Sequence, residues 1–188
     1  MPTPTRQFPA LSRLLHWAMA AMVLTMLGVG MAMVVSLGDY HALLSIHRPL
    51  GIAILVLVVI RFVNRRLNPP PPFPASMSEA ERRVATASEL AMYGLMLVLP
   101  LVGWGMLSAA RYPIVLYGSL ELPPILPHDV ALYAVLRTTH TVLAFLLFAT
   151  FIAHFGAALM HALIYRDCVF QSMASWSRAW VNSPALPK

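Results

Sequence analysis

Four long apolar stretches divide this chain, and each is long enough to cross a bilayer as a helix. The first is interrupted only by His16, Thr25 and Ser36, and it exceeds the apolar core of a signal peptide, so we expect it to be retained. A transmembrane helix needs about 20 predominantly apolar residues. The pattern predicts an all-α integral membrane protein, a four-helix bundle with spans at about 14–37, 41–62, 88–110 and 132–163.

Two proline-rich segments separate the later stretches. Residues 68–74 read Asn-Pro-Pro-Pro-Pro-Phe-Pro, and residues 111–129 contain four prolines. Proline lacks an amide donor and clashes with the preceding helical turn, so we expect both segments to be surface connections. The sequence shows no internal repeat. It predicts one four-span domain over residues 8–170 and a C-terminal tail over 171–188.

Charge is scarce and unevenly placed. Only 11% of residues are charged, whereas soluble domains carry about a quarter. The net charge of +6 would suggest nucleic acid in a soluble protein. Here ten basic residues fall in the N-terminus, in and around the connection between the second and third spans, and in the C-terminal tail, and only Arg48, Arg111 and Arg137 fall on the opposite side. Because basic residues gather in cytoplasmic loops, we expect both termini in the cytoplasm of a bacterium, an inner-membrane location and no nucleic-acid partner.

The single cysteine, Cys168, limits the cofactor chemistry. It permits no intramolecular disulfide, no C-x-x-C-H for covalent heme attachment and no thiolate set for zinc or an iron–sulfur cluster. We interpret it as an inert thiol near the membrane surface.

Four of the seven histidines, His16, His47, His140 and His154, lie at two matched depths within the predicted spans. Ionisable residues in a membrane are costly and mark functional sites, and neutral imidazole is a common axial ligand of heme iron. His140 and His154 are 14 residues apart on one helix, which is about 21 Å along the axis and within roughly 40° around it. His47 matches the depth of His140, and His16 matches that of His154. The pattern predicts two b hemes, held by His47/His140 on the periplasmic side and His16/His154 on the cytoplasmic side.

The other histidines have simpler interpretations. His41 and His128 fall in periplasmic turns, where we expect them to be solvated. His161 follows His154 by seven residues on nearly the same helix face. It is either an ordinary interfacial residue, or a residue that acts beside the cytoplasmic-side heme as a proton donor or hydrogen-bond partner. The sequence leaves both interpretations open.

Four arginines are candidates for the heme propionates, which need cationic partners at the membrane surface. Arg13 and Arg61 lie on the cytoplasmic side, where ordinary snorkelling explains them equally well. Arg48 and Arg137 lie within a turn of His47 and His140 on the arginine-poor side, so they are the stronger candidates.

Several short motifs occur in a specific order along residues 8–170: Arg13–Trp17, His47–Gly51, Arg61–Arg65, Asn68–Pro70, Tyr93–Trp104, and then His140, His154 and His161. In these segments the chain resembles the bacterial cytochrome b561 family of four-helix, di-heme inner-membrane proteins. The resemblance implies that His16, His47, His140 and His154 are the iron ligands and that electrons are exchanged with the quinone pool. One departure is Glu89, where many members carry a histidine, and it affects any cytoplasmic proton or quinone role taken from that residue.

Three functional hypotheses follow. The first is a quinone-linked oxidoreductase, in which superoxide or another small periplasmic donor enters through a basic surface at Arg111, Arg48 and Arg137, and ubiquinone is reduced near His161 and Trp17. The second is a cytochrome subunit that carries electrons between a partner dehydrogenase or hydrogenase and quinone, with residues 111–129 as the docking surface. The third is a transporter or proton channel without heme.

Overall fold

Four long helices make up most of the computed structural model, which describes residues 7–74, 77–116, 120–167 and 169–174. Two short strands pair antiparallel between the third and fourth helices, and the fourth helix continues into a π-helix, η1. The elements are α1 (Ala10–Val35), α2 (Tyr40–Leu67), α3 (Glu79–Ala109), β1 (Ile114–Val115), β2 (Glu121–Leu122), α4 (Val130–Leu159), η1 (Met160–Tyr165) and α5 (Val169–Ala174).

All four predicted spans are present, because α1, α2, α3 and the continuous α4–η1 helix are long and apolar enough to cross a membrane. This confirms the all-α membrane fold. The helix α3 begins nine residues before the predicted span, since Ser78 and Glu81 form a reciprocal capping box. The helix α5 spans residue 170, where we expect the four-span domain to end. Cys168 and residues 175–188 of the predicted tail lie outside the described residues.

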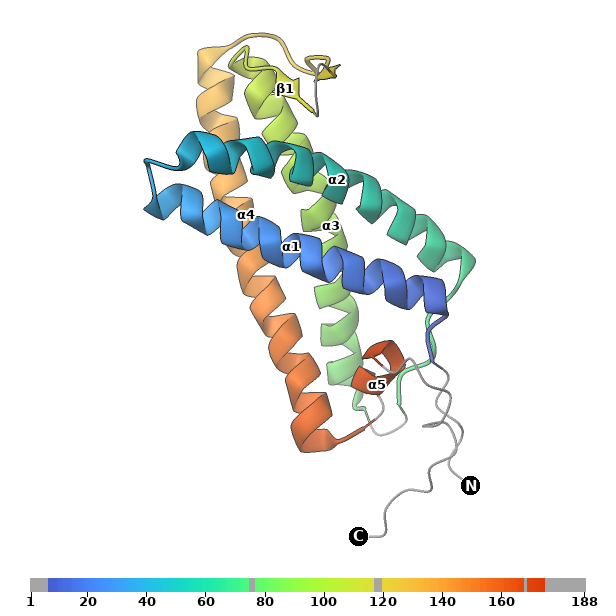
Figure 1. Ribbon diagram of the computed structural model, residues 1–188. Helices are drawn as coiled ribbons and strands as arrows, with labels where there is room; N and C mark the ends of the chain where they lie inside the picture. The colour runs from blue at the N-terminus through green and yellow to red at the C-terminus, as the bar shows by residue number, and fades with distance from the viewer. Residues whose placement is uncertain (1–6, 75–76, 117–119, 168, 175–188) are drawn as a thin grey trace, which may run out of the picture.

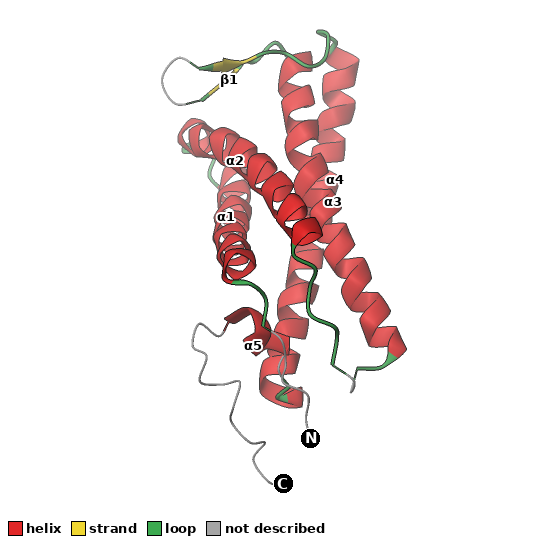
Figure 2. Cartoon of the chain, turned by 90° about the vertical axis from the view of Figure 1, so that its right-hand side faces the viewer, coloured by secondary structure: helices red, strands yellow, loops and turns green. Residues whose placement is uncertain are grey.

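The helices are arranged as two antiparallel hairpins, α1–α2 and α3–α4, which cross each other steeply (Figures 1 and 2). Close packing occurs within each hairpin and between α2 and α3, whereas α4 packs closely against neither α1 nor α2. We call the end where α1 begins and α2 ends the terminal side, and the end that carries β1 and β2 the strand side. The α4 backbone is therefore separated from α1 and α2, and α4 contacts the first hairpin mainly through side chains.

Hydrogen bonds join α1, α2 and α5 on the terminal side. The buried side chain of Asn64 in α2 donates from Nδ2 to Ser12 Oγ in α1 at 2.8 Å. The α5 helix returns to the start of the chain, where the Trp17 indole donates to the Met173 carbonyl at 3.2 Å and the Phe8 amide donates to the Ser172 carbonyl at 3.2 Å. These contacts connect α1, α2 and α5 on the terminal side.

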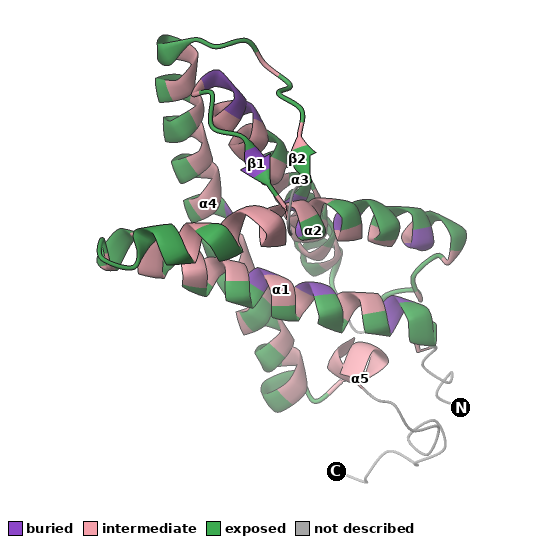
Figure 3. Cartoon of the chain, turned by 45° about the horizontal axis from the view of Figure 1, so that its top comes forward, coloured by how far each residue is buried: buried purple, intermediate pink, exposed green. Residues whose placement is uncertain are grey.

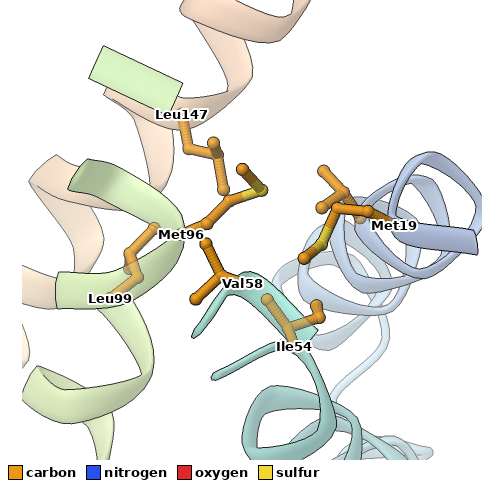
Figure 4. Close-up of a cluster of buried hydrophobic side chains, with 7 residues drawn as sticks. Met19, Ile54, Val58, Met96, Leu99 and Leu147 are labelled. Atoms are coloured by element: carbon orange, nitrogen blue, oxygen red, sulfur yellow. The ribbon is translucent and has the colours of Figure 1, made fainter. Parts of the chain in front are cut away.

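The apolar core is small and sits between the hairpins, while most outward side chains are exposed (Figure 3). In a membrane protein the exposed apolar surface faces lipid, so little apolar area needs a protein partner. The core takes one or two residues from each long helix (Figure 4): Met19, Val23, Ile54, Val58, Met96, Leu99 and Leu147.

Candidate heme-binding site

The strand-side pair of histidines joins α2 to α4. The rings of His47 and His140 face each other with centroids 6.2 Å apart and an interplanar angle of 64°. Nδ1 of the His47 ring is buried and has no hydrogen-bond partner within the described part of the chain. The His140 ring interacts with the Leu99 backbone.

The terminal-side pair joins α1 to α4. The rings of His16 and His154 lie 6.5 Å apart, centroid to centroid, at an interplanar angle of 58°. The guanidinium of Arg61 approaches this pair, with Nη2 3.4 Å from His16 Nδ1. A cation therefore lies directly beside the terminal-side pair.

Both ring separations fit a metal ion held between two imidazoles. A metal–imidazole bond is about 2.0–2.1 Å, and each ring nitrogen lies about 1 Å from its ring centre, so two axial rings on one ion are about 6 Å apart. The helices that carry each pair do not pack closely against one another, which is compatible with a flat macrocycle between them. The residues present therefore fit two bis-histidine hemes.

The core separates the two histidine pairs along the bundle. Leu147 lies seven residues after His140 and seven before His154 on α4, and it packs into the core with Met96 and Val58. Seven helical residues rise about 10 Å, so the core occupies the middle layer. The structure thus places the predicted pairs in two layers with an apolar layer between them.

The three strand-side arginines differ in their surroundings. Arg48 is half-buried beside His47, and its Nε is buried without a hydrogen-bond partner in the described ranges. Arg137 is exposed one turn before His140. Arg111 is exposed at the end of α3 with φ 59°, and it lies in the wall of a surface cavity rather than beside a histidine pair.

The terminal-side candidates lie close to His16. Arg61 also stacks over the Tyr93 ring at 5.4 Å, and the Trp17 ring meets His16 edge-on at 5.5 Å. Arg13 is buried and donates to Gln7 Oε1 at 3.2 Å. The structure thus brings Trp17 and Arg61 against the pair, while Arg13 has an identified contact elsewhere.

His161 lies in the π-helix and has a carboxylate partner. Its Nδ1 is 2.6 Å from Asp167 Oδ2, and its ring packs edge-on against Tyr165 at 5.2 Å. Arg166 adopts a left-handed conformation, φ 49°, and turns the chain so that Asp167 comes back to the histidine. His161 is therefore not an isolated interfacial residue, because its ring contacts both a carboxylate and an aromatic ring.

The sequence did not indicate two further features. Arg65 in α2 pairs with Glu89 in α3, with Nη2 2.8 Å from Oε2, although 24 residues separate them. A Cβ on Gly103 would lie 3.3 Å from His140 Cε1, so α3 approaches this ring closely only because a glycine is present. Both features join residues of different helices, so the spacing of residues along a single helix could not predict them.

Four apolar spans with two facing pairs of histidines define a multi-pass membrane cytochrome of the b type. The chain belongs to the prokaryotic cytochrome b561 family, whose model, described as "Prokaryotic cytochrome b561", matches residues 7–176. It is similar to a protein of Escherichia coli (strain K12) named cytochrome b561 homolog 2, with 31% identity over 175 residues that cover 91% of this chain and 92% of that protein.

The family and the fold together establish the general role. The protein is a multi-pass bacterial inner-membrane redox protein that binds b-type heme, typically two per chain in this family, and transfers electrons across the membrane.

Proposed function

We propose that this protein is a quinone-linked oxidoreductase that takes electrons from superoxide or another small periplasmic donor and passes them to ubiquinone. The observation that carries the proposal is the pair of histidine layers, His47/His140 and His16/His154, each with ring centroids 6.2–6.5 Å apart. They offer two iron sites along one bundle, as transfer across a bilayer requires.

The orientation is part of the proposal. Basic residues are concentrated on the terminal side, where Arg61, Arg65 and Arg66 end α2, and this side would face the cytoplasm. The strand side, with β1 and β2, would then face the periplasm. Electrons from a periplasmic donor would enter at the His47/His140 layer and leave at the His16/His154 layer.

Bound heme supplies reversible one-electron chemistry at its iron, and the protein supplies the ligands. An imidazole that binds iron through Nε2 keeps its proton on Nδ1. A guanidinium is only a donor, so Arg61 cannot keep its 3.4 Å contact with a protonated His16 Nδ1. Arg61 is then available to a heme propionate, which supports its assignment as a cofactor-binding residue.

The strand-side arginines would act on propionate and donor. The buried Nε of Arg48 lacks a partner within the described residues, and a propionate oxygen would satisfy it. Arg137 and Arg111 are exposed on the same side, and their charge would attract an anion such as superoxide. Arg13 is a further propionate candidate on the terminal side.

Quinone reduction requires protons as well as electrons. Two superoxide ions give up one electron each and become dioxygen, and one ubiquinone takes up both electrons and two protons. The His161–Asp167 pair, 2.6 Å between Nδ1 and Oδ2, would hold and deliver a proton on the terminal side, near the His16/His154 layer. Trp17 supplies a flat indole at 5.5 Å from His16 against which a quinone ring would stack.

The ligand assignment is tested by heme stoichiometry. We expect two b hemes per purified chain by pyridine hemochrome, and about one in His47→Ala or His16→Ala, because an iron site that loses an axial ligand binds weakly. The two variants should retain hemes with different reduced spectra. His41→Ala, an exposed histidine on the same helix as His47, is the control and should retain both. Two hemes in every variant would refute the assignment.

The reaction is tested with heme-loaded protein in detergent. Enzymatically generated superoxide should produce ubiquinol from ubiquinone-1, and His161→Ala should slow it by about 10²-fold or more if His161 is the proton donor. Hemes that dithionite reduces but superoxide does not would reject the superoxide reaction. Recovery of a second redox protein with the native chain in gentle detergent would then favour the subunit alternative.

A further inference from the structure

A cavity of about 610 Å³ lies on the strand side, between the end of α3 and the segment that contains β1 and β2. Its size is within the range of about 300–1,000 Å³ that organic ligands occupy, and it is far larger than a diatomic anion needs. The layered histidine site does not account for it, because none of the four paired histidines lines it.

The cavity walls combine flat apolar surfaces with charge at the rim. Trp104, Tyr112 and Leu126 supply aromatic and aliphatic surface, while Arg111 and Glu121 supply opposite charges. Both charged residues are exposed. Arg111 forms no ion pair or side-chain hydrogen bond along the described residues, so its guanidinium can bind an anionic group.

Hydrogen bonds hold the cavity in shape without a ligand. The Trp104 indole donates to the Pro123 carbonyl at 3.0 Å, and the Ile125 amide donates to Ser108 Oγ at 3.1 Å. His128 Nδ1 lies 2.7 Å from the Ala109 carbonyl. Because the wall is fastened to α3 before binding, little ordering entropy is lost when a ligand enters.

We propose that this cavity binds an organic anion with a planar aromatic ring, with the ring between the Trp104 and Tyr112 surfaces and the anionic group on Arg111. A carboxylate matches a guanidinium in charge and geometry, and aromatic walls favour a flat ring. The site adjoins the strand-side histidine layer, since Trp104 follows Gly103, where an added Cβ would lie 3.3 Å from His140 Cε1. This goes beyond the proposed function, in which Arg111 only attracts a small anion, because it assigns an organic ligand to the cavity itself.

Binding of 2-naphthoate is the test, measured by equilibrium dialysis with heme-loaded protein in lipid nanodiscs. Empty nanodiscs correct for partition into lipid. We expect saturable binding of one molecule per chain, and weaker binding of neutral 2-naphthalenemethanol. No saturable naphthoate binding above empty nanodiscs would overturn the proposal.

Substitutions at the rim separate this site from others. Arg111→Gln should weaken naphthoate binding about tenfold, as expected for losing a hydrogen bond to a charged group, while Arg111→Lys should retain most of it. Glu121→Gln should strengthen it a few-fold by removing a like charge. The heme spectrum of each variant verifies its fold and heme content, and the ubiquinone-reduction assay reports separately on the redox function. Unchanged affinity in correctly folded Arg111→Gln would overturn the proposal.

Discussion

Single residues determine how closely the helices approach the histidine rings. Gly103 is the clearest case, because a Cβ there would lie 3.3 Å from Cε1 and 3.5 Å from Nδ1 of His140. Contacts of 3.3 Å require the neighbour to move by a few tenths of an ångström. The ring of a metal ligand has little freedom to move, since its direction sets the metal–nitrogen bond.

Gly103→Ala should therefore weaken the strand-side heme selectively. We expect about a tenfold loss of affinity for that heme, comparable with disturbing a group that orients a ligand, and no change at the terminal-side heme. Titration of apoprotein with heme, followed in the visible spectrum, measures both sites. Gly94→Ala on the same helix is the matched control, because a Cβ there meets nothing within 4 Å. Equal effects at both sites would contradict the argument.

At the scale of elements, helix contacts are divided between an apolar middle and polar ends. Leu147 and Met96 pack in the middle, and the Asn64–Ser12 hydrogen bond joins α2 to α1 on the terminal side. Hydrogen bonds between membrane helices contribute about 0.6 kcal/mol on average and up to about 1.7. The α1–α2 hairpin therefore gains a modest, position-specific contribution from this bond.

Ser12→Ala should lower the free energy of unfolding by about 0.5–1.5 kcal/mol, because the buried amide of Asn64 loses its acceptor. Thermal denaturation in detergent, followed by loss of the heme absorption, should show a lower midpoint. Ser45→Ala is the control, since Ser45 is exposed and its hydroxyl bonds only to the Ala42 carbonyl of its own helix. A midpoint equal to that of the control would show that the Asn64 bond contributes nothing.

At the scale of the whole molecule, the crossing of two hairpins creates the site. Neither hairpin alone holds a pair of facing histidines, because His16 and His47 belong to the first and His140 and His154 to the second. Docking of the hairpins and heme binding are thus coupled. Heme removal should loosen the contact between hairpins before either hairpin unfolds.

The orientation of the molecule is a separate prediction. A fluorescent-protein fusion after Lys188 should fluoresce, and alkaline phosphatase inserted after Leu120 should be active, because the first folds in the cytoplasm and the second only in the periplasm. The basic residues at the end of α2 are the physical reason. The reverse pattern of activities would invert the proposed direction of electron entry.

The sequence by itself determined the four spans, the positions of the histidines and their division into two depths. These depend on local hydropathy and helical periodicity, which are properties of neighbouring residues. Only the tertiary structure brought Gly103 against His140, joined Arg65 to Glu89, returned Asp167 to His161 and formed the strand-side cavity. These contacts depend on how separate helices cross and how loops turn back, and no spacing along one helix specifies that geometry.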